Sequence, residues 1–519
     1  MVPLTDSVTQ GITQDTSFYM TTTFRDSLAT PPTKNYESPA VNAIGTNMKV
    51  GISSFGAWML GVGSIVGSMV WLFHTYMIAR AGALAAVIAW LLAALAFLPV
   101  TLILAELSSM FPTAGGPYVY KYYALKRLFP GTGELLGFLT GWLYWVCLIA
   151  GYACLSNSLV NLLATAIWGS VAASPIWFGP ATILCLFALA TLANLMQVGN
   201  VSKLNNLFTL MKFGMALAFG ALVFAVPTSS LANLFTFANP SGQTNLFANI
   251  ASVVTVAIGG YGGIELVACA SAETANASRN VPRSMMLTLI SVALIYATMS
   301  IAVAAASPYV LAPNKASVVI PGTSVQATIP DITGHIAGKP FGQLATALVI
   351  ASIVGCAVNG LLACARIGYS MALTGLFPIQ FAKLSAKSGV PSYSLVFQCT
   401  CMCILGVGAN ILSRAHIFAD AYSFLGEVFS YLYIMLIVLY GISVISLRYT
   451  DPDLPRPFRI GKRGNWLTWL LALPTIIIFS YIAFGCTQWI FQLTGLIILA
   501  SGVPIYGYYR WGKSAPQQA

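Results

Sequence analysis

Two glycine-rich stretches contain the residues of this chain that are best suited to holding a small polar ligand. The first covers residues 61–68 with the sequence GVGSIVGS, and the second covers residues 258–263 with the sequence IGGYGG. A glycine in a helix interior costs about 1 kcal/mol relative to alanine, so both stretches predict an interrupted helix. Unwinding frees backbone amides and carbonyls, and these groups need partners wherever water is absent.

The freed backbone groups predict a site for a molecule with one carboxylate and one ammonium group. A half-helix that begins after Gly63 would present free N–H groups and the positive end of a helix dipole, which suit a carboxylate. Carbonyls freed around the second stretch would suit an ammonium, and an α-amino acid has both groups. The predicted substrate-binding residues from the two stretches are Gly63, Ser64, Ile65, Gly67, Ser68, Gly259, Gly260, Tyr261, Gly262 and Gly263.

The composition indicates that these stretches lie inside a membrane. Of the 519 residues, 58% are hydrophobic and only 7% are charged, whereas about a quarter of the residues in a soluble domain are charged. Runs of about 20 apolar residues can cross a bilayer, and continuous apolarity without alternation favours helices over a barrel. We therefore predict an all-α integral membrane protein with twelve transmembrane helices, in the runs 51–77, 82–107, 135–168, 176–196, 204–226, 247–269, 285–306, 344–372, 393–411, 422–447, 466–486 and 489–507.

The positions of the two interruptions predict an internal repeat. They fall in the first and sixth runs, which are five positions apart in the order of helices, and this odd offset makes them cross the membrane in opposite directions. This spacing is typical of two inverted five-helix repeats around a central site. The alternative is close helix packing through small residues. The predicted repeats cover about 51–226 and 247–447, with helices eleven and twelve at about 466–507.

The net charge of +11 is better explained by membrane topology than by nucleic-acid binding. With the N-terminus inside, most Lys and Arg residues fall in inner segments, as the positive-inside rule requires. The segments predicted to lie outside contain Arg80, Lys315, Lys339 and Arg414. We expect a multi-pass protein of the cell (inner) membrane with both termini cytoplasmic, a disordered tail over 1–47 and a short tail over 511–519.

Several motifs resemble the amino acid–polyamine–organocation (APC) superfamily over about 48–510. The resemblance implies a LeuT-like fold, an amino acid or derived amine as substrate, and alternating access to a central site. It also implies that Tyr144 of the third helix lines the pathway. The matching pieces are residues 63–68 (GSIVGS), 105–118 (AELSSMFPTAGGPY), 261–265 (YGGIE), 272–283, 375–378 (GLFP) and 456–458 (RPF).

The chain departs from the common superfamily pattern at two positions. Many members read Gly-Ser-Gly in the first helix, where this chain has Met69 after Gly67 and Ser68. Many members also have a bulky aromatic residue four positions before the glycine that corresponds to Gly263, and here that position is Gly259. We expect either a larger substrate or another residue that closes the site.

Two charged residues inside the bilayer are candidates for coupling or gating. Lys212 lies in the middle of the fifth run and should either face a partner inside the bundle or extend to the cytoplasmic surface. By resemblance, it takes the structural place of a sodium ion and can relay a proton. Glu265 follows the second glycine stretch and either binds an ammonium or stabilises the break. Glu106 and Glu273 are expected at the inner gate.

Other functional classes fit the sequence less well. We find no nucleophile, paired carboxylates or metal-ligand spacing, so the chain is predicted not to be an enzyme and to need no metal or cofactor. The loop after the second run lacks the charged pattern of a major-facilitator carrier. The prediction is a secondary transporter that is proton-coupled or an exchanger rather than sodium-coupled. A transporter-like amino acid sensor and a polyamine or organic-cation exchanger remain alternatives, and the sequence does not indicate the oligomeric state.

Overall fold

The protein is an all-helical bundle in the part of the chain that the structure describes. This computed structural model describes residues 48–226, 230–235, 245–306, 328–417, 421–461 and 464–511. Over those ranges the extended contacts are two isolated bridges, Ile52 with Thr274 and Ala114 with Ala270, and no strands form. The predicted tail over 1–47 and residues 512–519 lie outside the described residues.

The α-helices of the described residues are longest where the sequence has an uninterrupted apolar run. They are α3 (Ser54–Ile65), α4 (Met69–Ala81), α5 (Ala83–Met110), α6 (Gly116–Leu128), α7 (Gly133–Trp168), α8 (Phe178–Asn194), α9 (Val198–Ala225), α10 (Leu246–Gly259), α11 (Leu266–Cys269), α12 (Ala277–Ala305), α13 (Ile329–Ala337), α14 (Lys339–Leu373), α15 (Ser392–Arg414), α16 (Ala421–Thr450), α17 (Trp466–Tyr481) and α18 (Trp489–Trp511).

The structure shows a multi-pass membrane protein. Among the described residues, 9 helices are long and apolar enough to cross a bilayer, or up to 10 when the bent pair α3 and α4 is taken as one span. Two apolar helices are shorter than the twelve-run prediction requires. Helix α8 has 17 residues and α10 has 14, against the roughly 20 that a straight span needs.

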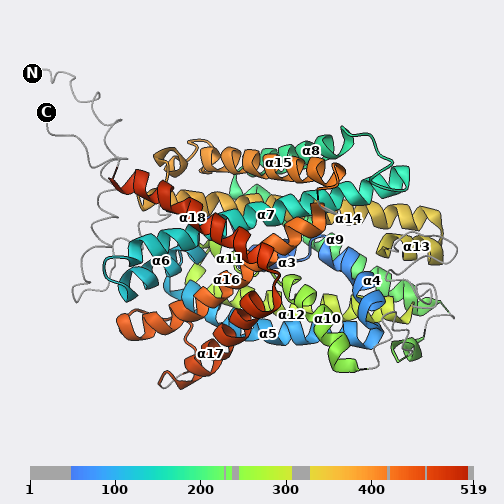
Figure 1. Ribbon diagram of the computed structural model, residues 1–519, viewed down its shortest axis with the longest axis horizontal. Helices are drawn as coiled ribbons and strands as arrows, with labels where there is room; N and C mark the ends of the chain where they lie inside the picture. Colours follow the sequence, from blue (N-terminus) through green and yellow to red (C-terminus); the bar gives the residue numbers. More distant parts are fainter. Residues whose placement is uncertain are drawn as a thin grey trace, which may run out of the picture.

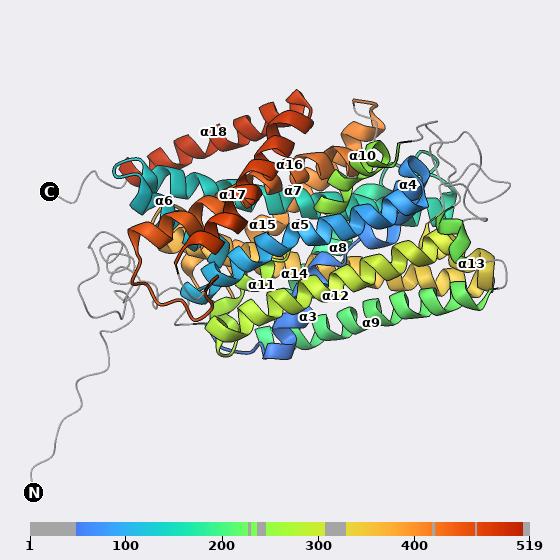
Figure 2. The ribbon, with the colours of Figure 1, turned by 90° about the horizontal axis from the view of Figure 1, so that it is seen from below.

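The long helices pack side by side and surround α3. In Figure 1, α3 lies near the centre of the bundle. It contacts α9, α12 and α14. Figure 2 shows α5, α12 and α9 running next to one another along much of the molecule. Helix α3 is therefore enclosed by protein, and groups freed at its end face other helices rather than lipid.

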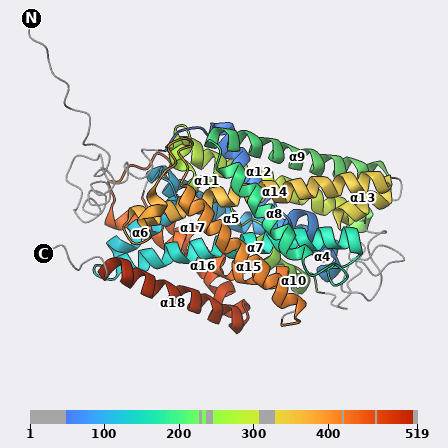
Figure 3. The same ribbon diagram turned by 90° about the horizontal axis from the view of Figure 1, so that it is seen from above.

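The outer helices present apolar side chains to the surroundings. Figure 3 shows α18 along one edge of the bundle. Leu496 and Ile497 on this helix are each 61% exposed. Leu192 on α8 and Leu217 on α9 are similarly exposed. Side chains of this kind are stable on the outside only where the solvent is lipid.

Candidate functional site

The first glycine stretch interrupts the first membrane span. Helix α3 ends at Ile65, α4 begins at Met69, and the two axes differ by 44°. The sequence prediction placed the start of the second half-helix directly after Gly63, and this was wrong. Gly63, Ser64 and Ile65 still belong to α3, so the positive end of the second half-helix lies at Ser68 and Met69.

Three side chains from two other helices satisfy the carbonyls at the end of α3. Lys212 Nζ on α9 donates to the Gly63 oxygen at 2.8 Å. On α14, Cys356 Sγ lies 3.1 Å from the Ser64 oxygen and Ser352 Oγ donates to the Val66 oxygen at 3.1 Å. The break is therefore built into the fold, because each of these carbonyls is held by a side chain that was not adjacent in sequence.

The amides at the start of α4 are left free. Ser68 makes no side-chain capping bond, and within the described part of the chain the N–H groups of Ser68, Met69 and Val70 donate to no acceptor. The first amides of a helix have no partner inside the helix and carry the positive end of its dipole. This end of α4 can therefore accept a carboxylate.

The second glycine stretch separates helix α10 from helix α11. Helix α10 ends at Gly259, and four residues of helix resume only at Leu266. Gly263 adopts a φ of 111°, which a residue with a side chain rarely adopts. Among the described residues, no donor reaches the carbonyls of Tyr261 and Gly262. These two oxygens are suited to an ammonium group.

The two interruptions meet in space through Tyr296 on α12. The Tyr296 hydroxyl donates to the Gly260 oxygen at 2.7 Å and lies 3.4 Å from the Ile65 oxygen. A Cβ atom built on Gly263 would lie 3.5 Å from the Ser64 oxygen. Sequence reasoning did not identify Tyr296, because a single tyrosine in an apolar run does not reveal which backbone group it reaches.

Glu265 lies in a buried network of tyrosine hydroxyls directly after the second break. Tyr144 on α7 donates to its Oε1 at 3.1 Å, and Tyr433 on α16 donates to its Oε2 at 2.7 Å. Tyr433 Oη is also 3.4 Å from the Gly263 amide. The structure thus brings together Tyr144, Glu265 and the second break, while Tyr433 was not among the predicted site residues.

Lys212 is buried in the bundle rather than extended to the surface. Its side chain is 2% exposed, and it reaches the carboxyl end of α3. An ammonium there is favourable because the carboxyl end of a helix is the negative end of its dipole. The alternative prediction of a lysine extended to the cytoplasmic surface is therefore wrong.

The two departures from the superfamily pattern are neighbours in space. A Cβ atom built on Gly259 would lie 3.8 Å from Met69 Cε and 3.4 Å from Ser430 Oγ. The methionine side chain thus lies against the position where other superfamily sequences are expected to have an aromatic ring. Methionine is flexible and adapts to irregular spaces, so this contact is suited to closing over substrates of different shapes.

Two adjacent glycines of the second break provide a matched pair for substitution. A Cβ atom on Gly260 would lie 2.5 Å from the buried ring of Trp90, whereas the nearest atom to a Cβ on Gly259 is 3.4 Å away. We expect Gly260→Ala to reduce thermal stability by about 1–3 kcal/mol through overpacking, and Gly259→Ala to be tolerated. Thermal unfolding of the two purified variants tests this, and equal midpoints would contradict it.

Two buried carboxylates away from the breaks form ion pairs with arginines. Arg366 on α14 binds both oxygens of Glu273 at 2.8 Å. Arg448 on α16 donates to Glu106 Oε2 at 2.6 Å, and Arg456 lies 3.5 Å from Glu106 Oε1. Both predicted gate carboxylates are thus paired, and each pair joins segments that are distant in sequence. Within the described ranges, no three His, Cys, Asp or Glu side chains are grouped to hold a metal ion.

Comparison with known proteins identifies the family. The model of the amino acid permease family matches residues 52–506. This chain belongs to the amino acid permease family. The predicted relationship to APC-superfamily permeases is confirmed. The family and the relatives are transporters, so the prediction that the chain is not an enzyme is also confirmed.

Several curated transporters are similar to this amino acid permease over most of their length. It is 26% identical over 493 residues to the glutamate/serine transporter AimA of Bacillus subtilis (strain 168), covering 88% of this chain and 81% of the relative. It is 25% identical to the gamma-aminobutyric acid permease of the same organism, covering 76% and 80%. It is 26% identical to the large neutral amino acids transporter small subunit 2 of Rattus norvegicus, covering 89% and 81%.

Proposed function

We propose that this permease is a secondary active transporter that moves an amino acid or a related amine across the membrane by alternating access. The observation that carries the proposal is the meeting of two interrupted helices around Tyr296. Three amides are free on one side of this junction and two carbonyls on the other. A zwitterion would satisfy both sets, and non-helical backbone at membrane depth is tolerated only where it is buried in protein or lines a cavity.

The proposed binding mode assigns each end of the substrate to one break. The substrate carboxylate binds the amides of Ser68, Met69 and Val70, and its ammonium binds the carbonyls of Tyr261 and Gly262. The neighbouring Gly63, Ser64, Ile65, Gly67, Gly259, Gly260 and Gly263 shape the two breaks. The contact between Met69 and Gly259 lies over the substrate side chain and sets how large it can be.

The proposed architecture has twelve spans in a LeuT-like pair of inverted five-helix repeats. In addition to the long helices, α8 would cross the membrane as one span. Helices α10 and α11 would together form another span, in which the continuous helix is short because the break interrupts it. The repeats would cover about 51–226 and 247–447 of a transporter domain over 48–510. Similarity to amino acid transporters over most of the chain supports this arrangement.

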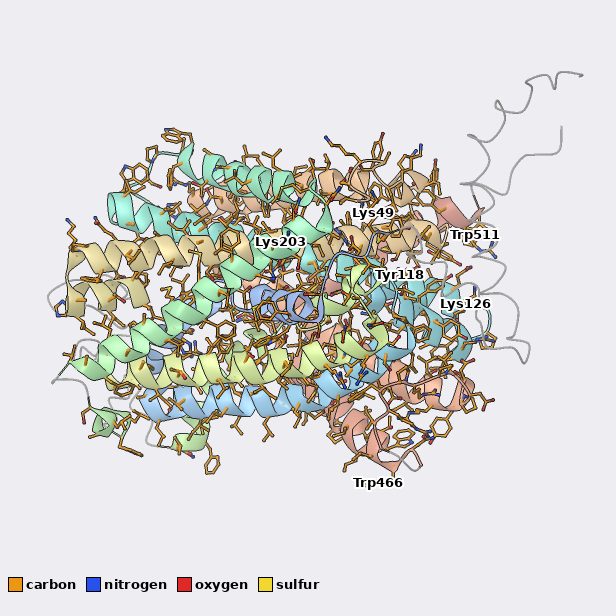
Figure 4. The ribbon with its side chains drawn as sticks, turned by 180° about the vertical axis from the view of Figure 1, so that it is seen from behind. Lys49, Tyr118, Lys126, Lys203, Trp466 and Trp511 are labelled. Atoms are coloured by element: carbon orange, nitrogen blue, oxygen red, sulfur yellow. The ribbon has the colours of Figure 1, made fainter. Side chains whose placement is uncertain are left out.

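We propose that the protein lies in the inner membrane of the cell and that both of its termini face the cytoplasm. Lys49, Tyr118, Lys126 and Trp511 lie toward the same end of the bundle (Figure 4). The positive-inside rule assigns the end that is rich in Lys and Arg to the cytoplasm. On this assignment α6, which is not one of the candidate spans, lies on the inner side.

The proposed coupling uses protons or exchange rather than sodium. The Lys212 ammonium already donates to the Gly63 oxygen at 2.8 Å, where a sodium ion would need carbonyl ligands. A resident positive charge disfavours a second cation at the same oxygen. Glu265, which accepts hydrogen bonds from two tyrosine hydroxyls, is a second group whose charge can influence the conformation of the second break.

A binding screen followed by counterflow tests the proposed function. Purified protein is first heated with single amino acids and polyamines, because a ligand of the folded state raises the unfolding midpoint. The best ligand is then used in proteoliposomes loaded with unlabelled substrate. We expect labelled substrate to accumulate transiently inside. Binding without counterflow would instead identify a sensor, and a polyamine as the strongest ligand would favour an organic-cation exchanger.

A further inference from the structure

A buried lysine on α6 has no role in the proposed binding mode. Lys121 was one of the basic residues predicted to lie in an inner loop, but its side chain is fully buried. Its Nζ has no hydrogen-bond acceptor among the described residues. It lies 4.8 Å from the ring centre of Tyr144 and 4.4 Å from that of Tyr440. A buried ammonium held only by two aromatic faces needs a compensating negative charge nearby.

The Glu265 carboxylate supplies that negative charge, and Tyr144 contacts both charged groups. The ring of Tyr144 faces the Lys121 ammonium, while the hydroxyl of the same residue donates to Glu265 Oε1 at 3.1 Å. Burial lowers the pKa of Lys121 to about 7, and the attraction of the Glu265 carboxylate acts in the opposite direction. The other titratable groups that act on Lys121 are the thiols of Cys147 and Cys269.

We propose that Lys121 is an internal counter-cation that determines substrate charge, because its ammonium compensates Glu265 from a cage formed by Tyr144 and Tyr440. This inference rests on the proposed transport of an amino acid at the two breaks. With Lys121 in place, the neighbourhood of Glu265 attracts no further cation, and the site favours substrates without a positively charged side chain. Without it, Glu265 is a buried, unbalanced carboxylate that attracts a cationic side chain.

The experiment compares inhibition of neutral amino acid uptake by arginine, lysine and agmatine in proteoliposomes. Uptake is measured at pH 6, below the pKa of Lys121, so that the ammonium carries its charge. For Lys121→Met we expect the three cations to inhibit at concentrations about tenfold lower than for the wild-type protein. In the double variant Lys121→Met/Glu265→Gln this gain should disappear, because no uncompensated carboxylate remains.

Lys126→Met provides the matched control. Lys126 lies on the same helix, but its side chain is 24% exposed and faces Glu134 at 3.8 Å, so its loss should not change inhibition by cations. Lys121→Arg should retain the wild-type selectivity because it retains the charge. Unchanged inhibition in Lys121→Met would overturn the inference, and so would a gain that persists in the double variant.

A reciprocal variant keeps the test decisive if Lys121→Met does not fold. Glu265→Gln leaves Lys121 uncompensated, so aspartate and glutamate should inhibit uptake more strongly than in the wild-type protein. If glutamate and aspartate inhibit this variant no better, the inference fails. Absence of amino acid binding by the wild-type protein would instead reject the proposed function itself, so the two failures are distinguishable.

Discussion

Replacing Lys212 by methionine should reduce amino acid uptake about tenfold or more. The ammonium donates to the Gly63 oxygen at 2.8 Å and neutralises the negative end of α3. A hydrogen bond to a charged group contributes about 1.5–3 kcal/mol, and a barrier change of that size corresponds to a tenfold or greater change in rate. Methionine has a similar length and no charge, so it fills the space and leaves the carbonyl unpaired. Initial uptake rates in proteoliposomes measure the effect.

Lys203→Met controls for the loss of a lysine on the same helix. Lys203 also lies on α9 but is exposed, so its replacement should leave uptake unchanged. Two further measurements separate a coupling role from a packing role. The pH dependence of uptake should change in Lys212→Met but not in Lys203→Met, and replacing sodium by choline should not affect the wild-type protein. A Lys212→Met variant with wild-type rate and pH dependence would contradict the proposed role.

The sequence located the two interruptions because glycine clusters carry a local energetic signal. Gly63 and Gly67 lie at the end of α3 and just beyond it, and Gly259, Gly260, Gly262 and Gly263 surround the end of α10. The propensity cost of several neighbouring glycines is large enough to predict a break without any tertiary information. It does not fix the residue at which helix resumes, which is why the start of α4 was predicted too early.

The partners of the freed carbonyls could not be predicted from the sequence. Ser352, Cys356 and Tyr296 each reach a carbonyl of the first break. In an apolar run, a serine can instead bond to its own helix, as Ser64 does with Leu60 at 2.6 Å. Only the packing of α12 and α14 against α3 decides between these two outcomes.

Charged residues gave the least reliable predictions because sequence does not show burial. Lys121 falls between the predicted runs 82–107 and 135–168, yet its nitrogen lies close to the rings of two buried tyrosines. Arg366 falls within the predicted run 344–372, but its partner Glu273 is 93 positions away along the chain. Long-range pairing of this kind depends on how α14 packs against the segment that contains Glu273, and no local pattern encodes it.

Replacing Arg366 by methionine should destabilise the protein by about 3–5 kcal/mol, because it leaves the Glu273 carboxylate buried without a partner. Both charged groups are nearly inaccessible, with side chains 1% and 2% exposed. The backbone oxygen of Glu273 also accepts hydrogen bonds from the amides of Gly51 and Ile52 at 3.0 Å. A displaced Glu273 would therefore also loosen the segment that leads into α3. Thermal inactivation of the purified variant, followed by loss of ligand binding, measures the effect.

The double variant Arg366→Met/Glu273→Met distinguishes a stranded charge from the loss of a stabilising contact. Removing both charges also removes the desolvation cost of each, so the double variant should be more stable than either single variant. The partly exposed pair of Lys126 and Glu134, 3.8 Å apart, provides the comparison, since breaking it should cost at most about 1 kcal/mol. If the stability losses of the two single variants, Arg366→Met and Glu273→Met, simply add in the double variant, the two residues stabilise the protein through separate contacts. The ion pair would then not be what holds the segment around Glu273 against α14.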